Sequence, residues 1–190
     1  MTTQRLDLLE LEDGESYEII WAPGPGLFDP ADRGLNVVPL GSHAWRGYHC
    51  SYAIRDGQLY LMDLELALTP EDAERYQRLG SPLPGTTCEV VDAEFGRLWG
   101  RDLSWPWSYE GELVVGLDFL GDEDVPGSGS PNDWWAYAQS WQLELEGGRV
   151  TQQVDRSQTA AEERRRRTTE LRGARRAEEG WDETEPTEPG

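Results

Sequence analysis

The chain has 190 residues, and its 37 acidic side chains outnumber its 17 basic ones, which gives a formal net charge of −20. Every basic residue apart from two histidines is an arginine, because the sequence contains no lysine. A charge this negative argues against a general nucleic-acid binder and against a protein held on anionic lipid, since both bind through basic patches. No run of about 18 apolar residues is present, so we expect no membrane-spanning helix.

The first residues, MTTQRLDLLELEDGES, show no basic start followed by an apolar stretch. We therefore expect no secretory signal and a cytoplasmic location. The only cysteines, Cys50 and Cys88, can form one disulfide at most. In a reducing compartment we expect both to be thiols and to be buried.

The first half of the chain contains two predicted hairpins. In each, an apolar run meets an aspartate-glycine pair and then resumes: Asp13-Gly14 in the first hairpin and Asp56-Gly57 in the second. These pairs favour the positive φ angles of the tight turns that join antiparallel strands. Alternation before the second turn places Tyr48, Cys50, Tyr52 and Ile54 on one buried face. The stretch from Pro23 to Pro39 is rich in glycine and proline and is predicted to be a loop.

A short helix is predicted over residues 69–79. Thr69 has the character of an N-cap, with Asp72 completing a capping box, and Pro70 suits the first helical position. Gly80 is placed to end the helix. Ala73, Tyr76 and Leu79 would face inward, which suits a short cover over the edge of a sheet.

Two more strands are predicted over 86–95 and 111–120, then an acidic loop over 121–133, then a last hairpin around Gly147-Gly148. Leu113, Val115 and Leu117 share one face of the second strand. Residues 1–154 therefore form a predicted acidic β-rich domain. We predict a mainly β fold, built as an antiparallel hairpin sheet or as a two-layer sandwich or partial barrel.

The composition changes near residue 155. Residues 155–190 are rich in arginine and glutamate, and the stretch 158–179 favours helix, with favourable i,i+4 pairs such as Glu162–Arg166. Leu171 and a few alanines form almost no apolar stripe, so we expect a solvated helix that no core anchors. The residues from Gly180 onward are predicted to be disordered. Most of the negative charge lies before this tail, since residues 1–150 hold 27 acidic residues and nine arginines.

The segment Trp45-Arg46-Gly47-Tyr48, with the alternation that follows into Leu59-Tyr60-Leu61, resembles a family of uncharacterised small bacterial proteins. Members of that family also carry a Tyr-x-Gly segment before a strand, matched here by Tyr109-Glu110-Gly111, and a closing hairpin with a glycine turn. The resemblance covers roughly residues 40–152. The segment 134–138 lacks the histidine and glycine of the family's Tyr-x-His-x-Gly-like pattern. The resemblance implies a β fold and a bacterial source, and it implies no reaction.

Catalytic and metal sites are poorly supported by the sequence. A cysteine–histidine enzyme or a zinc site would have to combine Cys50 or Cys88 with His43 or His49. No metal-binding spacing is present, and neighbouring strand residues point to opposite faces. The acidic loop lacks the ligand spacing of a calcium-binding hand and is expected to be solvated. We predict no catalytic residue, no metal and no cofactor.

The tryptophans are the most informative residues. The Trp105-Pro106-Trp107 and Trp134-Trp135 motifs place large rings on both sides of the backbone. One interpretation is a two-layer fold in which both faces are covered. The other is a partner-binding patch, because aromatic residues with arginine are typical of interface anchors. The candidate residues for such a patch are Trp45, Arg46, Trp105, Trp107, Trp134 and Trp135. Arg46 could equally be a structural cation stacked on a ring.

The function that these patterns favour is a non-enzymatic acidic interaction protein, similar in role to an immunity protein or antitoxin, that binds a basic protein partner. The alternative is a small-ligand or carbohydrate-binding module, or an enzyme, with a cleft lined by Trp134 and Trp135. A third interpretation is that the acidity reflects the composition of a whole genome. The partner and the oligomeric state are left open.

Overall fold

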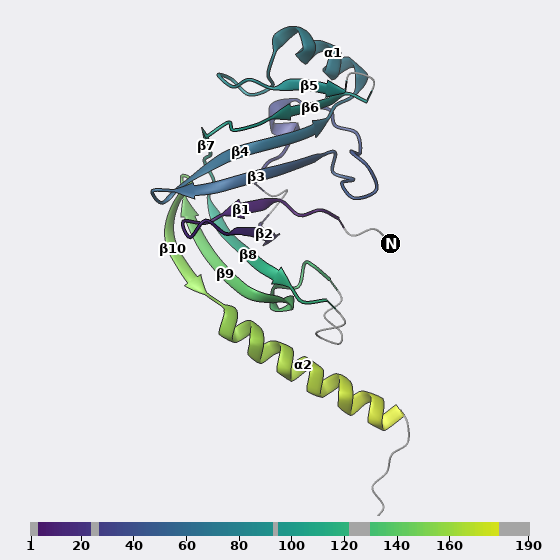
Figure 1. The fold of residues 1–190 in the computed structure, drawn as a ribbon, viewed down its shortest axis with the longest axis vertical. Helices are drawn as coiled ribbons and strands as arrows, with labels where there is room; N and C mark the ends of the chain where they lie inside the picture. Colours follow the sequence, from purple (N-terminus) through teal and green to yellow (C-terminus); the bar gives the residue numbers. More distant parts are fainter. Residues whose placement is uncertain (1–3, 24–26, 93–94, 122–129, 179–190) are drawn as a thin grey trace, which may run out of the picture.

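The computed structural model describes residues 4–23, 27–92, 95–121 and 130–178, without the side chains of 175–178. Ten strands dominate it: β1 (Leu8–Glu10), β2 (Ser16–Trp21), β3 (Tyr48–Arg55), β4 (Gln58–Ala67), β5 (Glu89–Asp92), β6 (Arg97–Gly100), β7 (Trp105–Pro106), β8 (Gly111–Phe119), β9 (Tyr137–Glu146) and β10 (Arg149–Asp155). The helices are α1 (Pro70–Leu79), α2 (Ser157–Glu178) and two short 3-10 helices, η1 (Ala31–Arg33) and η2 (Trp134–Ala136). The predicted mainly β fold with a short helix and a C-terminal helix is confirmed (Figure 1). Neither α-helix in the described residues is both long enough and apolar enough to cross a membrane.

The strands form one curled sheet in the order β10-β9-β8-β2-β1-β3-β4-β6-β5, with β7 paired to β4. The three predicted hairpins are present as β1–β2, β3–β4 and β9–β10. The sheet curls until Arg149 of β10 pairs with Gln58 of β4, next to a hydrogen bond of 2.8 Å from the Leu59 amide to the Gly148 carbonyl. The result is a partial barrel, with β5 and β6 continuing the sheet beyond β4 (Figure 1).

One pairing departs from the antiparallel prediction, because β1 runs parallel to β3. The short β1 pairs antiparallel with β2 on its other side. The segment between β2 and β3 crosses over, so that β3 starts beside β1 and runs in the same direction. Such a crossover needs a long connection that no local turn signal encodes, which is why hairpin patterns alone did not predict it.

The inside of the curled sheet is the main hydrophobic core. The predicted face of β3 is buried there, together with apolar residues of β8 and β9; the members are Tyr48, Cys50, Tyr52, Ile54, Leu113, Val115, Leu143 and Leu145. Both cysteines are buried free thiols, as predicted. Burial raises the pKa of Cys50 well above its usual value, because the charged thiolate would lose its hydration.

Helix α1 begins and ends as predicted, but two details differ. Pro70 opens it, and the Gly80 amide closes it on the Tyr76 carbonyl at 2.8 Å. The predicted capping box is absent: Thr69 is the N-cap residue but makes no side-chain capping hydrogen bond, and the Asp72 carboxylate instead accepts hydrogen bonds from the backbone and the side chain of Asn36. Leu79 does not face inward and is 66% exposed. The long-range bonds of Asp72 fix the helix against the loop before β3.

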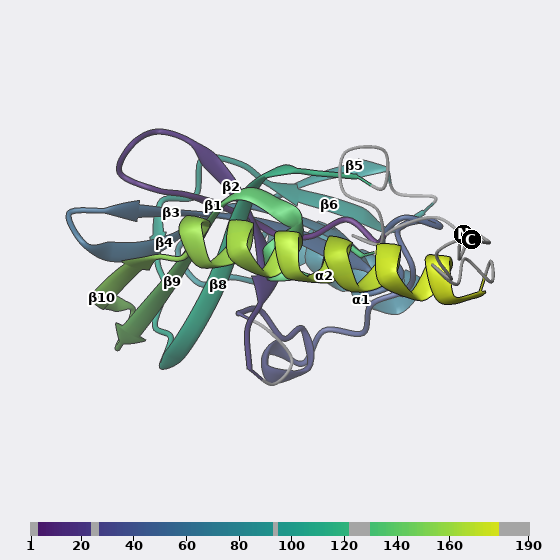
Figure 2. The same cartoon turned by 90° about the horizontal axis from the view of Figure 1, so that it is seen from below.

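Helix α2 has the predicted extent, but the prediction that nothing anchors it is wrong. Ala160 is fully buried in a second apolar cluster with Ile20, Trp135 and Tyr137 on the outer face of the sheet. The Arg164 guanidinium donates to the carbonyl of Trp135 at 2.7 Å. A small side chain suffices because it lets the helix approach the sheet closely. The second half of α2 extends away from the body (Figures 1 and 2). The predicted disordered end and most of the acidic loop lie outside the described residues.

Candidate binding site

Trp107 belongs to the core rather than to a surface. Its indole is buried, and its Nε1–H donates to the Leu27 carbonyl at 3.0 Å. Trp105 packs edge-on against it, with ring centroids 5.8 Å apart, and the Arg33 guanidinium lies 5.3 Å from the centroid of each ring. This burial removes Trp107 from the predicted partner-binding residues, and Trp105 serves mainly to cover it.

Arg46 and Trp45 have different environments although they are neighbours in sequence. The Arg46 guanidinium makes two hydrogen bonds to the buried carboxylate of Asp7, at 2.7 and 3.1 Å, and lies 4.6 Å from the ring centroid of Tyr48. Burial alone would lower the pKa of Arg46, but the adjacent Asp7 carboxylate raises it. Arg46 is therefore a structural cation stacked on a ring, the alternative to its role in a partner-binding patch. Trp45 is 72% exposed and remains a candidate surface contact.

Trp134 and Trp135, also neighbours in sequence, differ in burial in the same way. Trp135 is 2% exposed beneath α2, where the Arg167 guanidinium lies 4.4 Å from its ring centroid. Trp134 is half-buried and faces a cavity. This agrees with the two-layer interpretation, because α2 and η2 cover the outer face of the sheet here.

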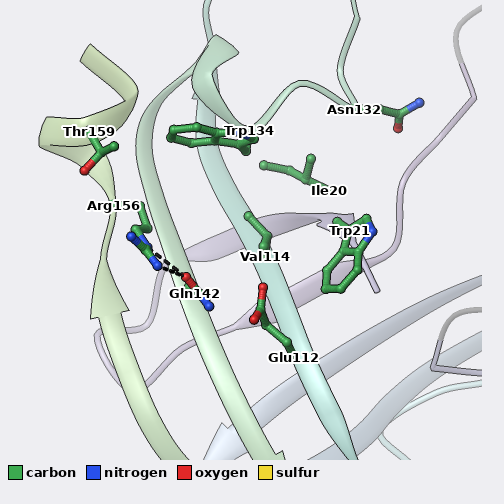
Figure 3. A pocket seen from close by; sticks show the side chains of 9 residues that line it. All are labelled: Ile20, Trp21, Glu112, Val114, Asn132, Trp134, Gln142, Arg156 and Thr159. Atoms are coloured by element: carbon green, nitrogen blue, oxygen red, sulfur yellow. Dashed lines mark hydrogen bonds between the residues drawn. The ribbon is translucent and has the colours of Figure 1, made fainter. Parts of the chain in front are cut away.

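The cavity has a volume of about 440 Å³ and lies on the outer face of the sheet, beside the start of α2. Ile20 and Val114 form its apolar floor, and Figure 3 shows Trp134 and Trp21 on two different sides of that floor. Trp21 ends β2 and is 47% exposed. No pattern in the sequence distinguishes Trp21 as a site residue, because a single tryptophan at the end of an apolar strand has the same pattern as a core residue.

Polar side chains line the remainder of the cavity. Glu112 of β8 directs its carboxylate toward Val114, and Arg156 lies across Gln142 from it (Figure 3). The Arg156 guanidinium donates from Nε to the Gln142 Oε1 at 2.7 Å, and its Nη2 contacts the same oxygen. Glu112 is the only carboxylate among the described lining residues, which include no cysteine or histidine. A carboxylate beside two indole rings suits binding of a polar or cationic group.

The three hairpin turns converge at one end of the barrel. The Gly57 amide donates to Glu12 at 2.9 Å, the Val150 amide donates to the Gly57 carbonyl at 2.9 Å, and the Gly147 amide donates to Glu110 at 2.8 Å. We call this the acidic end, because eight carboxylates lie in the three turns or close to them, and Arg55 and Arg149 are the only arginines there among the described residues. These carboxylates belong to Glu10, Glu12, Asp13, Glu15, Asp56, Glu110, Glu144 and Glu146.

A second groove, of about 420 Å³, crosses β3, β4 and β6 and has charges of both signs, with Arg5, His49 and Asp63 among its lining residues. His49 Nε2 lies 2.8 Å from the Leu6 carbonyl, so this nitrogen carries the hydrogen. Burial and the charge of Arg5 lower the pKa of His49. A neutral, buried histidine that is bonded to the backbone has a structural role here.

Fold and site together define a partial β-barrel protein with a tryptophan-flanked cavity on its outer face and an acidic end beside it. No protein-family model, no curated protein and no solved structure matches the chain significantly.

Proposed function

We propose that the chain is a non-enzymatic binding protein whose acidic end docks a basic protein partner, in a role like that of an immunity protein or antitoxin. The observation that carries the proposal is the convergence of the three hairpin turns, because eight carboxylates and two guanidinium groups belong to residues in these turns or close to them. Such a field accelerates the approach of an oppositely charged protein and disfavours acidic ones.

Backbone hydrogen bonds fix part of this surface and leave other carboxylates without a partner among the described residues. Glu12 and Glu110 are held by amide donors of neighbouring turns, and Arg55 pairs with Glu10. The exposed carboxylates of Glu15 and Glu146 have no hydrogen-bond or ion-pair partner among the described residues. Hydrogen bonds therefore hold the backbone of the acidic end in place, while some of its carboxylates stay available to a partner. This combination favours docking of a preformed basic surface.

The test starts with affinity capture from the native host, purification of the captured basic protein and measurement of its association rate. Neutralising three acidic-end residues together (Glu15→Gln, Glu144→Gln and Glu146→Gln) should slow association by about fivefold or more at low salt. The matched control neutralises three exposed carboxylates elsewhere: Glu71→Gln, Glu74→Gln and Glu89→Gln. Equal slowing in both variants, an association rate that ignores salt, or capture of no basic protein would each contradict the proposal.

A second candidate function is a small-ligand or carbohydrate-binding module. It is favoured by the cavity volume of about 440 Å³, with Trp134 in its wall. Pockets of this size accept small ligands, and indole rings stack on neutral sugars. Binding of a neutral sugar that perturbs Trp134 and ignores the loss of Glu112 would support this alternative.

A further inference from the structure

We propose that the cavity beside α2 receives the guanidinium group of an arginine side chain from the basic partner, paired with Glu112 and stacked on Trp21 or Trp134. The inference rests on the proposed function and names the contact that would anchor it.

The placement of Glu112 favours a cationic ligand. It lies directly opposite Glu144 on the neighbouring strand, so two carboxylates share one face of the sheet. Directly opposed like charges destabilise a sheet. Neither carboxylate has a hydrogen bond or an ion pair to another residue of the described chain. A cation that enters the cavity would remove this repulsion and gain a charge-assisted hydrogen bond.

The surface beside Glu112 suits a planar cation. Trp21 and Trp134 present two indole rings at the sides of an apolar floor (Figure 3). A planar guanidinium stacks on such a ring while its edge donates to a carboxylate. The compact and strongly hydrated ammonium group of lysine makes less use of this surface. The cavity therefore fits arginine better than lysine.

The cavity already contains one cation of the chain itself, Arg156. Arg156 lines the wall next to α2, and both its Nε and its Nη2 point to the Gln142 Oε1. Its charge repels an entering cation from that wall and leaves the Glu112 side as the favourable position. The Gln142 amide oxygen is occupied, so Glu112 is the strongest acceptor that remains open in the described lining.

The cavity is continuous with the acidic end. Glu144 belongs to the acidic end and is the cross-strand neighbour of Glu112. A partner docked on the acidic end would therefore have the cavity at the margin of the same contact surface. An arginine inserted between aromatic residues is typical of the few residues that carry most of an interface's binding energy.

The direct test uses N-acetyl-L-arginine amide as the probe and the indole Nε1–H signals of the nine tryptophans as the readout. Trp21→Phe and Trp134→Phe identify the two relevant signals. At least one of the two signals should shift saturably with the arginine amide, and neither should shift with N-acetyl-L-citrulline amide, its neutral analogue. Glu112→Gln should weaken binding by about tenfold, the loss expected for one charge-assisted hydrogen bond.

The charge-matched control is Glu146→Gln at the acidic end, which should weaken binding of the amide by less than about twofold, because a solvated charge outside the cavity is screened. Equal weakening by the two variants, equal shifts with the citrulline amide, or shifts confined to other tryptophans would overturn the inference. The spectrum of free Glu112→Gln shows whether this variant is folded.

The captured basic partner separates this inference from the proposed function. If the partner binds wild type and Glu112→Gln equally, the cavity inference fails and the proposed function stands. If the arginine amide occupies the cavity but no basic protein binds, the proposed function fails and a free guanidino compound replaces the partner's arginine. Binding of both, with partner affinity reduced in Glu112→Gln and little changed in Glu71→Gln, supports the inference.

Discussion

Glu112 of β8 and Glu144 of β9 are directly opposed cross-strand neighbours, and among the described residues neither has a counter-ion. Two carboxylates in this position reduce stability. A protein that keeps them next to two indole rings retains an unfavourable contact in a place where a cationic ligand would turn it into a favourable one.

Replacing Glu112 should therefore stabilise the free protein. We expect Glu112→Gln to raise the free energy of unfolding by about 0.5 kcal/mol, because the cross-strand repulsion is removed. Urea unfolding monitored by tryptophan fluorescence measures the change. Glu71→Gln is the control and should lower stability slightly, since a carboxylate in the first turn of α1 interacts favourably with the helix dipole. A less stable Glu112→Gln would show that the repulsion is not significant.

The pair of Arg46 and Asp7 should be essential for the fold. Arg46→Met leaves the Asp7 carboxylate buried without its cation, so we expect a loss of about 3 kcal/mol in unfolding free energy. Arg55→Met breaks an exposed pair with Glu10 and should cost less than about 1 kcal/mol. Similar losses in the two variants, measured by urea unfolding, would contradict the structural role of Arg46.

Gly116 should not tolerate a side chain. A Cβ atom at this position would lie 2.4 Å from Tyr137 Cγ and 2.7 Å from Ile20 Cδ1. We expect Gly116→Ala to cost about 2 kcal/mol through overpacking beneath η2. Gly173→Ala in α2 meets no atom within 4 Å and should be neutral or stabilising, because alanine favours helix. Thermal unfolding of both variants tests the contrast, and an equally stable Gly116→Ala would refute it.

The first half of α2 should contribute to stability and the second half should not. A chain that ends at Arg156 loses Ala160 and exposes the indole of Trp135, so we expect it to lose about 2 kcal/mol or more. A chain that ends at Thr168 keeps these contacts and the bond from Arg164, and should unfold at the same urea concentration as the full chain. Equal midpoints for the two truncations would mean that α2 is a passive extension.

Most tyrosines should resist ionisation in the native state. Burial is the main cause that raises the pKa of Tyr17 to about 12, and the hydrogen bond to Asp13 is the next. Burial is also the main cause of the raised pKa values of four other tyrosines: Tyr48, Tyr52, Tyr109 and Tyr137. Because the folded-state pKa is higher than that of the unfolded chain, this contribution to stability is complete below pH 10 and is lost as the pH rises toward 12. Absorbance at 295 nm during alkaline titration should therefore show five of the seven tyrosines ionising late or together with unfolding. Ionisation of all seven near pH 10 before any loss of structure would contradict the burial.

The residue sequence alone was enough to predict the elements that depend on local interactions. Asp-Gly and Gly-Gly pairs between alternating strands predict the three hairpins, and Thr69, Pro70 and Gly80 predict the limits of α1. The helical character of α2 and the burial of Cys50 follow from composition and alternation. These features need only neighbours within a few residues, so a linear pattern contains the necessary information.

The tertiary structure decided which distant residues meet. The parallel pairing of β1 with β3 depends on a crossover, and the role of Ala160 depends on the surface that α2 covers. Only packing distinguishes buried Trp107 and Trp135 from exposed Trp45. Trp21, Glu112 and Trp134 lie on three separate segments that the curled sheet brings to one cavity. Their contact energies arise only when the chain is folded, so no local pattern reveals this site. The net charge of −20 was evident from the sequence, but only the convergence of the three turns brings eight of the carboxylates to one end of the fold.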